Sequence, residues 1–75
     1  MTEFAIRGEY IELDKLLKAA RLCGTGGEAK MVISEGLVTV DSETELRLRR
    51  KVRPGMTVSY NSQSVSVVPP ASGHP

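Results

Sequence analysis

Cysteine and histidine are almost absent from this chain of 75 residues. The single Cys23 has no partner for an intramolecular disulfide, and the only histidine is His74, beside the last residue. One cysteine and one histidine cannot supply the four ligands of a structural zinc site. The chain also lacks a nucleophile matched with a base. We therefore expect no enzyme, no metal and no cofactor, and we expect Cys23 to be a small buried or loop thiol.

Long apolar runs are missing as well. No run approaches the roughly 20 residues of a membrane-spanning helix, and the N-terminus carries no secretory signal. A chain of 75 residues predicts one small domain with a marginal core and little room for an enzyme pocket. The lone cysteine favours a reducing compartment. Together these features predict a cytoplasmic protein with no membrane partner.

Acidic residues are absent from residue 46 to the end of the chain. Residues 1–45 have a formal charge of −4, whereas residues 46–75 have a charge of +5. All five cations of the second part lie within seven positions: Arg47, Arg49, Arg50, Lys51 and Arg53. Such a cluster attracts polyanions. Charges also protect edge strands from pairing, so the cluster alone leaves both explanations open.

Apolar spacing predicts a first helix from about Glu12 to Leu22. Its buried stripe has the i, i+3, i+4, i+7 spacing and consists of Leu13, Leu16, Leu17 and Ala20. Asp14 and Lys18 form an acid-first i, i+4 pair on the exposed face, and Arg21 continues that face. Two helices of this length need a sheet to pack on.

The second predicted helix has a clear start. Thr25 and Glu28 have the spacing of a capping box, in which the glutamate reaches back to the cap. Ala29, Val32 and Ile33 form its buried face, and Gly36 can end it in the left-handed conformation. The Gly26-Gly27 pair either holds a phosphate on free N–H groups or permits close packing, and both explanations stay open.

Alternation predicts the strands. Phe4 and Ile6 indicate an N-terminal strand, and later strands are expected at 38–40, 46–51, 58–60 and 65–67. In the basic strand, alternation places Arg47 and Arg49 opposite Leu46 and Leu48. Turns are expected at 41–42, at 61–62 and at 53–56, where Pro-Gly favours a type II turn. We assign residues 1–68 to the domain and residues 69–75 to a disordered tail.

Aromatic residues number only three, Phe4, Tyr10 and Tyr60. Folds that read single-stranded bases on a sheet need exposed rings. The scarcity argues against such a platform, and the strand parity of Tyr60 with Val58 favours a place in the core.

The order of these motifs resembles the S-four RNA-binding domain, a family named after the fourth protein of the small ribosomal subunit. The motifs that carry the resemblance are Leu13–Lys18, Thr25–Lys30, Glu35–Val40, Glu45–Lys51 and Gly55. They span Tyr10 to Val58, about two-thirds of the chain. The family's usual Asn-Gly turn is Asp41-Ser42 here, and Met56 replaces its usual acidic residue. The resemblance implies an α+β fold, with two short helices packed on a small, mostly antiparallel sheet (the αL fold).

The resemblance also implies a non-enzymatic protein that binds structured RNA, ribosomal or transfer RNA, through its phosphate backbone, in association with the ribosome. Carried over by position, the RNA-binding residues are the helix-one cations Lys15, Lys18 and Arg21, the helix-two start Thr25, Gly26, Gly27 and Lys30, and the strand cations Arg47, Arg49, Arg50 and Lys51. Arginine's planar fork suits phosphate. We expect the strand to supply most of the attraction, because acidic neighbours offset the helix cations.

Two other functions are compatible with the composition. A protein–protein adaptor would use the basic strand to bind an acidic partner, for instance a ribosomal or assembly protein. A ubiquitin-like carrier would need a reactive C-terminal Gly-Gly, and the Ser72–Pro75 ending argues against it. Charged edges on so small a chain favour a monomer.

Overall fold

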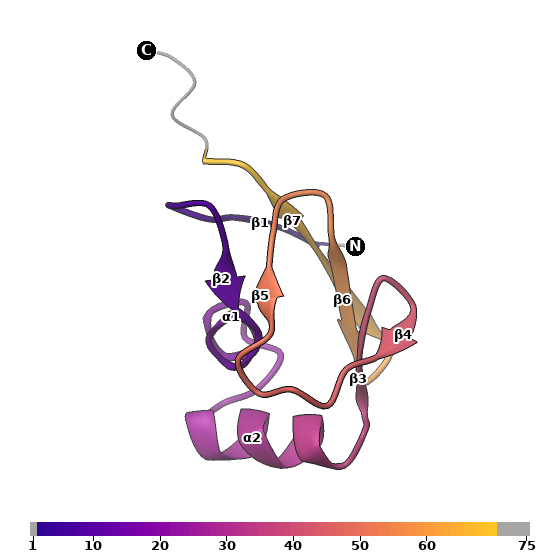
Figure 1. The fold of residues 1–75 in the computed structure, drawn as a ribbon. Coiled ribbons are helices and arrows are strands. Elements are labelled where there is room, and N and C mark those ends of the chain that lie inside the picture. The colour runs from indigo at the N-terminus through magenta and orange to yellow at the C-terminus, as the bar shows by residue number, and fades with distance from the viewer. Residues whose placement is uncertain (1, 71–75) are drawn as a thin grey trace.

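A computed structural model describes residues 2–70 of the chain (Figure 1). The described part forms two helices and seven strands. In chain order they are β1 Thr2–Ala5, β2 Ile11–Glu12, α1 Leu13–Ala19, α2 Gly26–Ser34, β3 Val38–Val40, β4 Glu43–Thr44, β5 Lys51–Val52, β6 Thr57–Tyr60 and β7 Gln63–Val68. Pro69 and Pro70 are exposed and lie outside the strands. The rest of the predicted tail, residues 71–75, lies outside the described residues, so the division into domain and tail stays a prediction.

The strands form two separate sheets. Five strands pair in the order β1-β7-β6-β3-β4, and β1 is parallel to β7 while the other pairs are antiparallel. β2 and β5 form a second, two-stranded antiparallel sheet, which we call the β2–β5 ribbon. Figure 1 shows both helices at one end of the molecule, next to the ribbon. The predicted fold class, two short helices with a mostly antiparallel sheet, is confirmed.

One core joins the helices to both sheets. The predicted stripe of α1 supplies Leu13, Leu16 and Leu17, all fully buried. The alternating valines of β3, β6 and β7 bury their side chains against it, because every second residue of a strand points to the same face. Val52 of the ribbon is also fully buried, whereas Tyr60 is half-buried against the cluster, as its parity predicted. No helix between residues 2 and 70 is long and apolar enough to cross a membrane.

Two tight turns set the register of the large sheet. Val40 pairs with Glu43 across Asp41 and Ser42, and Tyr60 pairs with Gln63 across Asn61 and Ser62. All four turn residues have positive φ values, between 52° and 70°. Two-residue loops with this backbone twist match the right-handed twist of the strands. The predicted type II turn is present too, with a φ of 96° at Gly55 and a hydrogen bond from Met56 N to Arg53 O of 3.1 Å.

The first helix ends earlier than predicted, at Ala19. Arg21 has a φ of 64°, and its N–H donates to Lys18 O at 3.1 Å, while Leu22 N–H donates to Leu17 O at 2.9 Å. These two bonds form a Schellman motif, which closes a helix through a left-handed residue. α2 ends in the same way through Gly36, with a φ of 76°. Gly36 made the end of α2 predictable from the sequence, whereas Arg21 gave no sign that α1 ends before it.

Replacing Ser42 with glycine should stabilise the protein, because glycine adopts positive φ without the Cβ clash that serine pays. We expect the free energy of unfolding to rise by about 0.5–1 kcal/mol in urea titrations. The matched control is Ser66→Gly within β7, where glycine should lower stability. A loss of stability in Ser42→Gly would contradict the role assigned to this turn.

Candidate nucleic-acid interface

The cations between β4 and β5 lie on an irregular segment, residues 45–51, which we call the basic segment. The predicted strand over 46–51 is wrong: only Lys51 is in a strand, and Arg50 N–H donates to Arg47 O at 3.3 Å in a turn. The alternation with buried leucines fails too. Leu46 is 63% exposed, and only Leu48 packs partly against the core.

Backbone hydrogen bonds attach the basic segment to the start of α1. Leu13 N–H donates to Arg50 O at 2.9 Å, and Asp14 N–H donates to Leu48 O at 3.1 Å. The first N–H groups of a helix have no partner within the helix, and Glu12 at the cap position makes no side-chain cap bond. The carbonyls of the basic segment therefore cap α1.

Glu45 holds two of the arginines in place. Its carboxylate accepts hydrogen bonds from Arg47 Nε at 2.9 Å, from Arg47 Nη2 at 3.3 Å and from Arg47 N at 3.0 Å. Arg50 Nε lies 3.7 Å from the same carboxylate. The side-chain hydrogen bond from Arg47 is the main cause that lowers the pKa of Glu45. The Glu45 side chain is only 13% exposed, whereas that of Arg47 is 71% exposed. The hydrogen bonds from this largely covered carboxylate orient the Arg47 guanidinium and offset part of its charge.

The four predicted cations of this segment are brought together. Arg47, Arg49, Arg50 and Lys51 line one hollow of about 360 Å³. Arg50 Nε is buried and has no hydrogen-bond acceptor among the residues that the structure describes. The nearest anionic group to this N–H is the Glu45 carboxylate, 3.7 Å away. Arg49 is exposed, and no ion pair involving it is found between residues 2 and 70.

The α1 cations lie beside this segment. Lys15 and Lys18 are exposed and three residues apart, so they share one face of the helix. The first turn of α1 carries the two bonds to the basic segment, which places Lys15 near it. The expected ion pair of Asp14 with Lys18 is not found in the described part of the chain. Instead, Lys15 Nζ lies 3.4 Å from Glu12 Oε1.

The start of α2 is also exposed. Thr25 Oγ1 accepts a hydrogen bond from Glu28 N–H at 3.1 Å, as predicted. Glu28 reaches back one residue further than a capping box requires, and its Oε1 accepts from Gly24 N–H at 2.9 Å. A Cβ added at Gly26 would meet nothing within 4 Å, and one at Gly27 would meet only Thr25 Oγ1 at 3.9 Å. Close packing therefore does not explain the glycines, whose backbone is open to a ligand. Lys30, one turn on, is exposed as well.

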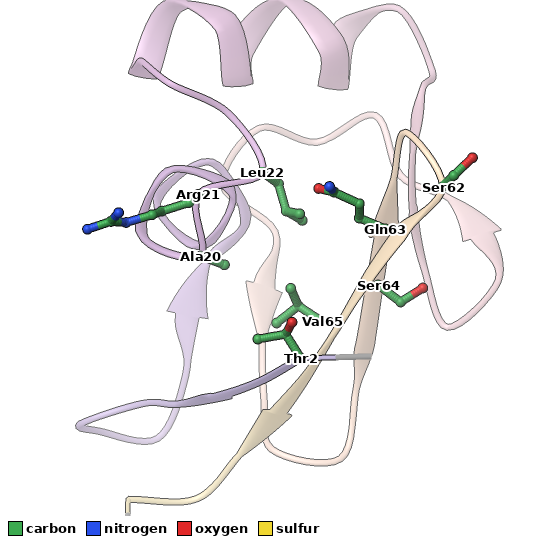
Figure 2. A pocket seen from close by; sticks show the side chains of 8 residues that line it. All are labelled: Thr2, Ala20, Arg21, Leu22, Ser62, Gln63, Ser64 and Val65. Atoms are coloured by element: carbon green, nitrogen blue, oxygen red, sulfur yellow. The ribbon is translucent and has the colours of Figure 1, made fainter.

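Arg21 was predicted to be a cation of the first helix, and this placement is wrong. It lies in the turn after α1, and its side chain extends away from Gln63 and β7 (Figure 2). Arg21 is also among the residues that line a hollow of about 510 Å³, together with Leu22 and the start of β7.

Cys23 is a buried thiol. Burial, and to a lesser extent the nearby Glu28 carboxylate, raises its pKa, which disfavours the reactive thiolate. No group of three or more potential metal ligands is found within residues 2–70.

Comparison with known proteins identifies the family. A family model described as the S4 domain, the S-four domain named above, matches residues 4–68. The chain belongs to the S4 domain family.

Two relatives show how far the S4 likeness extends. YbcJ of Escherichia coli K12, named as a candidate RNA-binding protein, is 44% identical over 59 residues, which cover 79% of this chain and 84% of YbcJ. Its solution structure, described as revealing an αL (alfaL) motif involved in RNA binding, matches with a TM-score of 0.71 and 40% identity over 91% of this chain and 87% of that one. The 30S ribosomal protein S4e from Thermoplasma acidophilum matches with a TM-score of 0.66 over 77% of this chain and 31% of S4e. At 22% identity this second match shows the shared S4-like fold alone.

The Glu45 contacts predict a pH dependence of stability. Because its pKa in the folded protein is lowered, the Glu45 carboxylate stabilises the fold above its ordinary pKa of 4.5. That stabilisation is lost as the pH falls through the lowered value. Replacing Glu45 with glutamine should cost at most about 1 kcal/mol at neutral pH, since Arg47 is largely exposed. The difference from the original protein should shrink on acidification, as measured by urea titrations from neutral pH downward.

The matched control for Glu45 is Glu43→Gln. Glu43 is exposed, and no ion pair involving it is found in the described part of the chain. Its replacement should leave the acid limb of the stability curve unchanged. Equal effects of both replacements at every pH would contradict the special role of Glu45.

Proposed function

We propose that this protein binds structured RNA through the phosphate backbone, without catalysis. The observation that carries this proposal is the hollow lined by Arg47, Arg49, Arg50 and Lys51 on a segment attached to α1. Arg47, which Glu45 holds in place, loses less conformational entropy when it binds a phosphate than a free side chain does. The arginines can also form bidentate bonds to phosphate oxygens.

Membership of the S4 domain family supports RNA as the partner. Two further features support it: the name given to YbcJ and the RNA-binding motif ascribed to its structure. Ribosomal or transfer RNA and association with the ribosome are finer parts of the proposal. The monomeric state and the cytoplasmic location stay predictions from the sequence.

The proposed interface has three parts. The basic segment supplies the densest charge, α1 adds Lys15 and Lys18, and the open N-terminus of α2 adds backbone N–H groups next to Lys30. Arg21 projects from the turn between the helices. Glu45 reduces the net charge but fixes Arg47, so the interface relies on position as well as on charge.

Replacing Arg49 with alanine should weaken RNA binding and leave the fold intact, because the side chain is exposed and carries no ion pair within residues 2–70. Each lost phosphate contact should reduce the slope of log affinity against log salt by about 0.7–0.9. Arg47→Ala should also weaken binding, with a small added loss of stability from its bonds to Glu45. Fluorescence anisotropy with a labelled RNA hairpin at several salt concentrations measures both quantities.

Arg49→Lys is the matched control, since it keeps the charge and removes the planar fork. It should retain the salt slope and lose only part of the affinity. Binding that is indifferent to salt and to Arg47→Ala and Arg49→Ala would contradict phosphate recognition. In that case an acidic protein partner becomes the better explanation, and a pull-down whose captured proteins survive nuclease treatment would support it.

A further inference from the structure

The outer face of the β2–β5 ribbon carries a cation that lies outside the basic segment, Arg53, on the same face as Lys51. Ile11 pairs with Val52, and both turn toward the core. Glu12 pairs with Lys51 on the opposite face. Because side chains alternate along a strand, Tyr10 and Arg53 fall on the same outer face as this second pair. The ribbon therefore continues the cationic surface beyond the predicted site.

Tyr10 contacts both cations of this face. Lys51 Nζ is 5.0 Å from the centroid of the Tyr10 ring, and Arg53 Cζ is 5.7 Å from it. Both distances are within the range of a cation–π interaction. The ring nevertheless remains 40% exposed, which makes Tyr10 one of the few large exposed apolar side chains in the described part of the chain. The two cation–π contacts leave part of the ring surface accessible to a ligand.

Tyr10 lies next to the basic segment, because Lys51 contacts its ring. Lys51 belongs both to the ribbon and to the hollow lined by Arg47, Arg49 and Arg50. A nucleic-acid strand that follows these cations would reach the Tyr10 ring directly after Lys51. On the other side, Tyr10 borders a hollow of about 570 Å³ that Lys15 also lines.

Each chemical group here matches one part of a nucleotide. Arg53 and Lys51 fit the phosphates, and the face of the ring fits a base. A base within a duplex is already stacked on its neighbours, so the ring is available only to an unpaired one. The scarcity of aromatic residues argues against a sheet-wide platform, but it is compatible with a single stacking site.

We propose that Tyr10, flanked by Lys51 and Arg53, is a stacking site for one unpaired RNA base at the point where a strand leaves the duplex held by the basic segment. This inference rests on the proposed RNA-binding function and specifies its substrate as a junction between double-stranded and single-stranded RNA. The alternative is that the ring serves only to hold the two cations in place.

The test uses two RNA hairpins with the same stem, one with a flush end and one with a short single-stranded extension. The first unpaired base of the extension is 2-aminopurine, whose fluorescence falls on stacking. We expect the original protein to bind the extended hairpin more tightly and to quench its fluorescence. Tyr10→Leu should abolish the quenching and the preference, a loss of roughly 5- to 150-fold in affinity for the extended hairpin. Tyr10→Phe, which keeps the ring, should retain both.

The outcomes separate the two levels of the proposal. If neither hairpin binds at low salt, the proposed function fails and the stacking site fails with it. If both hairpins bind equally and Arg49→Ala weakens both, the RNA-binding function stands and the stacking site is wrong. An equal loss for both hairpins in Tyr10→Leu would show that the ring only positions Lys51 and Arg53. If the original protein binds the extended hairpin but does not quench its 2-aminopurine fluorescence, the stacking site is wrong.

Discussion

The arrangement of this protein depends on how α1 is capped. Glu12 offers no side-chain cap, so the N–H groups of Leu13 and Asp14 take the carbonyls of Arg50 and Leu48 as acceptors. An unpaired buried N–H costs free energy comparable to a lost hydrogen bond, so these two bonds favour the docking of the basic segment on α1. It draws the basic segment out of the large sheet and against the helix pair. The ribbon of β2 and β5 continues the same attachment.

The docking of this segment also decides what its charges can do. As a strand, the segment would alternate its arginines with buried leucines and spread them along one edge. As a loop that caps α1, it gathers four cations around one hollow, and the Glu45 carboxylate contacts two of them. The same path carries Lys51 and Arg53 to the ring of Tyr10. The proposed phosphate contacts and the proposed stacking site are therefore neighbours on the surface.

Several features could be predicted because their causes are local. The cap at Thr25, the Gly36 stop, the type II turn at Gly55 and the alternating valines all depend on residues close in sequence. The stop of α1 was missed, since a Schellman motif with Arg21 at the left-handed position has no glycine to reveal it. The basic strand was wrong because Leu46 and Leu48 imitate a strand pattern, while the partners that forbid one lie more than thirty residues earlier in the chain.

The sequence by itself determined the fold class, the family and the identity of the cationic residues, because these follow from apolar spacing, turn residues and charge composition. Only the tertiary structure decided which cations meet, which two of them Glu45 contacts, where Arg21 points and that Tyr10 stands beside Lys51 and Arg53. The contacts of Tyr10 with Lys51 and Arg53 join residues far apart in the chain, and the pairing of the ribbon brings them together. Glu45 and Arg47 are close in sequence, but their contact depends on the path of a segment that alternation had predicted to be a strand.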